Sequence, residues 1–114
     1  MDTVVDRLIR YAKVYSESDY HAGRAVTPST QRQFDMGRLL VEELHGLGIE
    51  NAVLDEKCYV YASVPASPGC EHLPAIGLIA HMDTTPDMTG KDVKPQVIHY
   101  EGGDVVLNRC LLYT

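Results

Sequence analysis

The sequence of 114 residues has the length of one domain, and its composition, 45% apolar and 23% charged, is typical of a chain that folds. A net charge of −6 without any basic run excludes a surface that neutralises nucleic-acid phosphates, and no apolar stretch is long enough to cross a membrane. We therefore expect neither a nucleic-acid partner nor a membrane partner. Three cysteines without a closely spaced pair suit free thiols in a reducing compartment, and the first residues lack the pattern of a secretory signal, so we expect a cytoplasmic protein.

The first predicted element is an amphipathic helix over residues 3–15. Apolar residues recur there at helical spacing and make one face: Val4, Val5, Leu8, Ile9 and Ala12. Thr3 can cap this helix, and Asp6 lies in its first turn, where the helix dipole favours an anion. Residues 16–28 are polar and end in proline, so they are predicted to form a loop.

A second helix is predicted to begin at Thr30. Thr30 and Gln33 have the spacing of a capping box, in which each side chain satisfies a free backbone N–H of the first turn. An apolar stripe follows along the helix: Phe34, Leu40, Val41, Leu44 and Leu47. Gly46 and Gly48 predict the end of the helix, because glycine readily takes the left-handed conformation that terminates helices.

The middle of the chain predicts strands. Residues 52–54 make a short candidate, and residues 58–64 alternate between apolar and polar side chains. Residues 75–80 are apolar at every position, which is typical of a strand buried on both faces of a sheet. Two weaker candidates flank a pair of glycines: 96–100 and 104–107. The predicted fold class is α/β, with two N-terminal helices packed on a mixed sheet.

The segment Ala80-His81-Met82-Asp83-Thr84 is the candidate for chemistry, because it directly follows the apolar strand, and ligand sites gather at the carboxyl ends of strands. In an extended chain, residues 81 and 83 point the same way. A histidine that donates one ring N–H to a carboxylate keeps its other nitrogen for a metal, so His81 and Asp83 could form such a pair. The spacing alone favours a plainer interpretation, a histidine bonded to an aspartate that holds a turn.

One histidine does not complete a catalytic zinc site, which normally has about three protein ligands. The other histidines are interpreted as surface or packing residues: His21, His45, His72 and His99. The sequence contains neither a nucleophile elbow nor a glycine-rich phosphate loop. Cys58 is placed like a core residue, and no partner histidine is marked for it.

The run PAIGLIAHMDTTPD, residues 74–87, resembles the first metal-binding segment of the peptidase T family, cytosolic tripeptide aminopeptidases among the di-zinc exopeptidases. The HMDT core is shared with carboxypeptidases and deacylases, whereas the extension TPDMTGKDVKPQ over 85–96 points to peptidase T in particular. VTPST over 26–30 and Gly102-Gly103-Asp104 are similar too. The likeness runs to about Leu107, and the residues after Asn108 depart from it.

The resemblance implies that His81 is the first zinc ligand and that Asp83 is the active-site carboxylate that orients it. It implies an enzyme with two zinc ions that removes the N-terminal residue of short peptides. Residues 1–114 would be the N-terminal, incomplete portion of its catalytic domain. The family's bridging aspartate, its Glu-Glu pair and its later ligands lie further along a longer chain, so we expect these residues alone to bind zinc weakly and to be inactive.

Exposed sheet edges and apolar surface in such a portion predict a homo-oligomer. Two alternatives stay open. The first is another metallopeptidase or deacylase of the same clan. The second is a catalytically dead fragment that acts as an oligomerisation or binding module.

Overall fold

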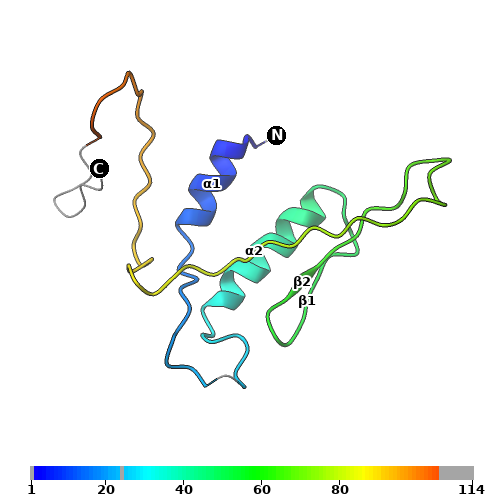
Figure 1. Cartoon of the computed structure of the whole chain (residues 1–114), viewed down its shortest axis with the longest axis horizontal. Coiled ribbons are helices and arrows are strands. Elements are labelled where there is room, and N and C mark those ends of the chain that lie inside the picture. Colours follow the sequence, from blue (N-terminus) through cyan, green and yellow to red (C-terminus); the bar gives the residue numbers. More distant parts are fainter. Residues whose placement is uncertain (1, 24, 106–114) are drawn as a thin grey trace.

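The computed structural model describes residues 2–23 and 25–105. The regular elements follow in the order α1 (Val4–Ala12), α2 (Gln33–Gly46), β1 (Val53–Leu54) and β2 (Val60–Tyr61). After β2 the chain continues without helix or strand up to residue 105, and Figure 1 shows it crossing in front of α2 before it turns along α1. Within the described ranges, no helix is long and apolar enough to span a membrane.

Helix α1 begins with a capping box that Thr3 and Asp6 form. The Thr3 hydroxyl accepts the backbone N–H of Asp6 at 3.1 Å, and the Asp6 carboxylate accepts the backbone N–H of Thr3 at 2.8 Å. The Thr3 hydroxyl also donates to the Asp6 carboxylate at 2.7 Å, and this bond, followed by the bond from the Thr3 backbone N–H, lowers the pKa of Asp6. The predicted helix and its cap are therefore confirmed, although the helix ends at Ala12 and not at residue 15. No residue of α1 is buried, so its apolar face is open.

Helix α2 is confirmed, but its predicted capping box is wrong. The helix begins at Gln33, Arg32 occupies the N-cap position, and no side chain caps it. The Thr30 hydroxyl instead donates to the backbone oxygen of Glu17 at 2.7 Å, and the Gln33 amide donates to Ser29 Oγ at 2.9 Å. A contact between distant parts of the chain has therefore replaced the local one.

The C-terminus of α2 is closed by a Schellman motif, with Gly48 in the left-handed region at φ +83°. The Gly48 N–H donates to the His45 carbonyl at 2.9 Å, and the Ile49 N–H donates to the Leu44 carbonyl at 3.0 Å. These two bonds satisfy carbonyls that the end of a helix leaves without partners. The predicted helix end at the glycines is therefore confirmed.

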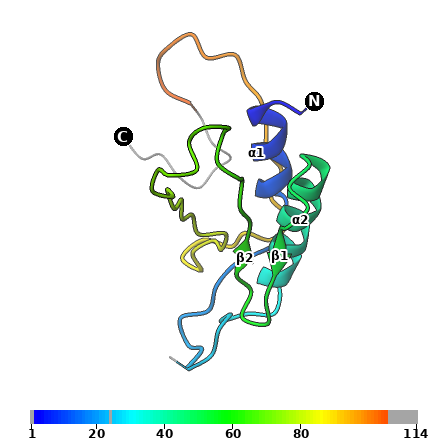
Figure 2. The same ribbon diagram turned by 90° about the vertical axis from the view of Figure 1, so that its right-hand side faces the viewer.

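Strands β1 and β2 form an antiparallel hairpin that lies along α2 (Figure 2). The turn between them is built by Asp55, whose carboxylate accepts the backbone N–H groups of Lys57 and Tyr59 at 2.9 and 2.8 Å. Cys58 lies in this turn at φ 66° and is buried, with Met36 of α2 and Ala52. Burial is the main cause that raises the pKa of the Cys58 thiol.

Gly37 allows α2 to approach the hairpin closely. A Cβ atom at this position would lie 2.7 Å from Cδ1 of Leu54, so no larger residue fits without displacement of the β1 side chain. The buried centre of the described structure is thus the contact between α2 and the hairpin, whereas α1 joins α2 through charged side chains.

The predicted sheet is only partly right. The mixed α/β character is confirmed, but the described residues form a single two-stranded antiparallel sheet, and residues 75–80 are not a strand. Ile76, Leu78 and Ile79 are 88%, 94% and 101% exposed. A strand buried on both faces needs paired neighbours and covering layers, and no part of the described chain provides them. Residues 96–100 are likewise irregular, and the candidate at 104–107 lies partly outside the described residues.

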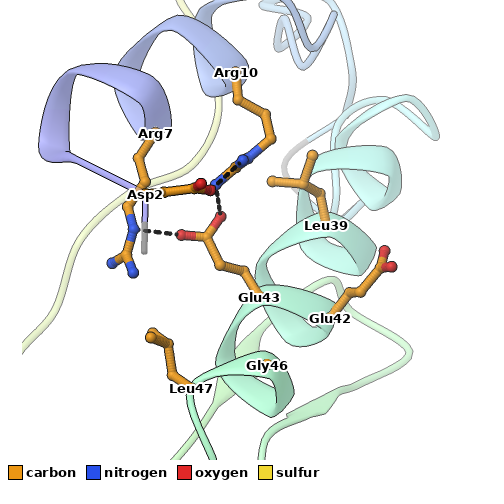
Figure 3. Close-up of a pocket in the computed structure, with 8 residues that line it drawn as sticks. All are labelled: Asp2, Arg7, Arg10, Leu39, Glu42, Glu43, Gly46 and Leu47. Carbon is orange, nitrogen blue, oxygen red and sulfur yellow. Dashed lines mark hydrogen bonds and ion pairs between the residues drawn. The ribbon is translucent and has the colours of Figure 1, made fainter.

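Helices α1 and α2 are joined by a charged cluster around Glu43 (Figure 3). The Glu43 carboxylate accepts a hydrogen bond from Arg10 at 2.9 Å, and Arg10 also binds Asp2 at 2.6 Å. The Tyr11 hydroxyl donates to the same carboxylate at 2.8 Å. Arg7 Nε lies 2.9 Å from Glu43, close enough for an ion pair, although its N–H is not aimed for a hydrogen bond. Burial and then the bond to Glu43 raise the pKa of Tyr11.

Replacing Gly48 tests the Schellman motif. We expect Gly48→Ala to lower the free energy of unfolding by about 1 kcal/mol, because a Cβ atom is strained at positive φ. Gly46→Ala is the matched control, since Gly46 is the last residue of α2 and has open space around it, and alanine there should raise stability by up to about 1 kcal/mol. Urea unfolding followed by circular dichroism measures both, and equal effects of the same sign would contradict the assignment.

Replacing Glu43 tests the cluster between the helices. We expect Glu43→Ala to lower the free energy of unfolding by about 2 kcal/mol, because its half-buried partners lose their shared acceptor. Glu42→Ala is the control, since Glu42 is its exposed neighbour on the same helix and gains the same helix propensity. The cluster has no stabilising role if the two variants unfold at the same urea concentration.

Candidate functional site

The candidate site lies where the chain after β2 crosses the loop that follows α1 (Figure 1). Glu17 and Thr84 form a parallel bridge there. The Thr84 N–H donates to the Ser16 carbonyl at 3.3 Å, and the Thr84 carbonyl accepts the Ser18 N–H at 2.9 Å and the Ser18 hydroxyl at 3.1 Å. Both the N–H and the carbonyl of Thr84, the residue after Asp83, are therefore bonded to the loop after α1.

The structure brings His81 and Asp83 together. His81 Nδ1 lies 2.9 Å from the Asp83 backbone oxygen and 3.2 Å from the carboxylate oxygen Oδ1. Both oxygens can only accept, so we assign the ring hydrogen to Nδ1, which leaves the lone pair of a neutral ring on Nε2. The His81 side chain is 85% exposed. The arrangement is the one in which a carboxylate orients an imidazole whose second nitrogen is available to a metal.

The predicted surroundings of this pair are wrong. His81 and Asp83 do not follow a central strand, because residues 75–80 form none, and the pair lies on an exposed stretch of chain. The side chains nevertheless meet, since a separation of two residues brings them together in an extended segment.

Glu17 and Tyr20, which lie in the loop predicted over residues 16–28, hold the chain beyond Asp83. The Tyr20 hydroxyl bonds with Thr85 Oγ1 at 3.0 Å and donates to Asp87 at 3.2 Å. The Glu17 carboxylate accepts the backbone N–H of Gly90 at 3.0 Å. These contacts join residues 65 to 73 positions apart, so no local pattern marks them.

The described residues do not supply the ligands of a complete zinc site. No group of three histidine, cysteine, aspartate or glutamate side chains within residues 2–23 and 25–105 could hold a metal. His45 is engaged with the Ala52 carbonyl at 3.0 Å, and His21, His72 and His99 are exposed. His81 Nε2, with Asp83 behind the ring, fits one position of a site that needs about three.

A pocket of about 460 Å³ lies elsewhere, between α1 and α2 (Figure 3). It is lined by residues of both helices: Asp2, Arg7, Arg10, Leu39, Glu42, Glu43, Gly46 and Leu47. Its guanidinium groups are already paired with Asp2 and Glu43, and no histidine or nucleophile lines it. The pocket is therefore a gap at the contact between the two helices, and His81 remains the better candidate for chemistry.

Comparison with known proteins agrees with the family resemblance. No family model matches the chain. It is 50% identical over 111 residues to "Peptidase T" of Alkaliphilus oremlandii, which covers 96% of this chain and 27% of that protein. It is 46% identical over 107 residues to "Peptidase T" of Geobacillus kaustophilus, which covers 93% of this chain and 25% of that protein. The chain is homologous to peptidase T.

A third relative, "Peptidase T" of Parabacteroides distasonis, is 45% identical over 106 residues, with 93% of this chain and 25% of that protein covered. The predicted resemblance to the peptidase T family is thus confirmed over nearly the whole chain. The chain spans about a quarter of the length of the curated relatives it matches.

Proposed function

We propose that this chain provides the first portion of the catalytic domain of a zinc-dependent aminopeptidase that releases the N-terminal residue of tripeptides. The observation that carries the proposal is the His81–Asp83 pair, with Nδ1 bonded to Asp83, in a chain homologous to peptidase T over 96% of its length. Free Cys58 and Cys70 suit a reducing cytoplasm, where we place the enzyme.

In this proposal, His81 binds one zinc ion through Nε2, and Asp83 orients the ring. The negative carboxylate beside Nδ1–H makes the imidazole a stronger ligand and keeps the tautomer in which Nε2 carries the lone pair. Zinc, when bound, supplies polarisation of the scissile carbonyl and activation of a water molecule. Asp83 and the backbone beyond it have the task of holding His81 in one orientation before metal and substrate arrive.

The remaining ligands and the general base must come from residues beyond this portion, because the described residues contain no group of three side chains that could hold a metal. The same observation supports the alternative of a catalytically dead fragment. The coding sequence downstream of codon 114 distinguishes the two. An open frame with further acidic and histidine ligands supports the enzyme, and a stop codon with nothing similar beyond it supports the fragment.

The proposed site can be tested by catalysis in a complete enzyme. A chimera is made of Alkaliphilus oremlandii peptidase T in which this chain replaces the 111 matching residues. We expect it to cleave tripeptides in the presence of zinc. Asp83→Ala should lower kcat/KM about 10- to 100-fold, because it removes the partner that orients a ligand, and His81→Ala should lower it further, because it removes the ligand.

His72→Ala is the control, because His72 is an exposed histidine nearby in the sequence, and its loss should leave kcat/KM unchanged. The isolated chain of 114 residues with zinc should show no turnover. A folded chimera that keeps full activity after His81→Ala would overturn the ligand assignment. Turnover by the isolated chain would show that the site is made of other residues.

The exposed apolar residues lead to a prediction about self-association. We expect the isolated chain to form homo-oligomers, because the apolar side chains of residues 75–80 are exposed and the backbone there has no strand partner in the described structure. Leu78→Lys should reduce association, whereas Lys91→Arg, a conservative exposed control, should not. Sedimentation measures both, and a stable monomer of the unaltered chain at high concentration contradicts the prediction.

A further inference from the structure

We infer that Glu17 is a positioning residue for the His81–Asp83 pair, an inference that rests on the proposed function of that pair. Glu17 lies in the loop after α1, opposite Thr84 in a parallel bridge whose hydrogen bonds are made by the neighbouring Ser16 and Ser18. Its carboxylate accepts the Gly90 N–H at 3.0 Å. Glu17 thus holds one end of the segment 84–90, while Ser16 and Ser18 hold the other.

Glu17 is itself fixed by two further contacts. Its second carboxylate oxygen accepts the Tyr15 hydroxyl at 3.3 Å, and its backbone oxygen accepts the Thr30 hydroxyl at 2.7 Å. The Tyr15 ring is in turn covered by the Arg32 guanidinium, 4.4 Å from the ring centre. The position of Glu17 is therefore fixed by Tyr15 before it and by residues at the start of α2.

The segment 84–90 forms a closed loop whose two ends lie close together. A Cβ atom at Gly90 would lie 3.1 Å from Thr84 Oγ1, so its two ends approach closely. Tyr20 ties Thr85 and Asp87 together at 3.0 and 3.2 Å. The bond from Gly90 to Glu17 closes this loop against the rest of the chain.

The peptide plane between Asp83 and Thr84 connects this loop to His81. The Asp83 carbonyl, which accepts His81 Nδ1–H at 2.9 Å, and the Thr84 N–H, which donates to Ser16 at 3.3 Å, belong to the same planar unit. Holding the N–H in one direction fixes the direction of the carbonyl. Glu17 acts on His81 through this plane, because its carboxylate fixes Gly90 close to Thr84, whose backbone Ser16 and Ser18 bond.

The experiment uses nuclear magnetic resonance on the intact 114-residue chain. Two quantities are measured: the hydrogen-exchange rate of the Gly90 amide and the ring nitrogen signals of His81, which report the tautomer. Glu17→Ala should accelerate Gly90 exchange at least about tenfold, because a bond to a charged acceptor is lost. It should also shift His81 from a single Nδ1–H form toward a mixture of tautomers.

Two further variants separate positioning from general stability. Glu17→Gln keeps an acceptor oxygen and should restore both signals most of the way, while Glu56→Ala, at an exposed turn of the hairpin, should change neither. Urea unfolding should place the midpoint of Glu17→Ala close to that of the unaltered chain. The inference is overturned if Glu17→Ala leaves the His81 tautomer unchanged, or changes it only by unfolding the chain.

This test is independent of the proposed function. The His81 ring signals are read without zinc or substrate, so they report positioning even if the chimera proves inactive. Loss of activity in the chimera after His81→Ala, together with unaltered tautomers in Glu17→Ala, would keep the function and reject the positioning role.

Discussion

The hydrogen bonds that Thr84 makes with Ser16 and Ser18 are the interaction on which the second half of the structure depends. Among the described residues after Ser63, every hydrogen bond to the earlier chain is made by a residue of the segment 16–20. An extended chain must find partners for its backbone groups outside itself. The site is therefore located by the loop after α1, and not by the packing of a core.

The features that the sequence predicted correctly are those whose partners lie within a few residues. The cap of α1 joins Thr3 and Asp6, and the end of α2 is set by Gly48 and the residues just before it. The start of α2 shows the opposite case. Thr30 has the chemistry and spacing of a cap, but its hydroxyl donates to the backbone oxygen of Glu17, 13 residues earlier. This longer-range bond forms in place of the local cap.

The same distinction separates the two halves of the candidate site. His81 and Asp83 are close in sequence, so their pairing could be predicted from a separation of two residues. Glu17 and Tyr20 could not be found, since their partners lie more than 60 positions away. Residues 75–80 carry the pattern of a strand inside a sheet, yet Leu78 and Ile79 are 94% and 101% exposed. The pattern encodes an environment that the described residues do not supply, which is consistent with a chain a quarter as long as its relatives.

Under the proposed function, the fixed orientation of the His81 ring and the number of zinc ligands have separate physical origins. Fixing the His81 ring before metal arrives removes rotational freedom that binding would otherwise have to restrict, so it strengthens the contribution of His81 to metal affinity. A single imidazole gains little from this preparation, because a zinc site becomes tight and chemically active only with about three ligands in place. Local tethers such as Glu17 and the Asp83–Thr84 peptide plane can therefore be complete in this chain while the metal site is not. Orientation is decided by bonds within residues 15–90, whereas coordination requires side chains that the rest of a longer enzyme brings to the same point.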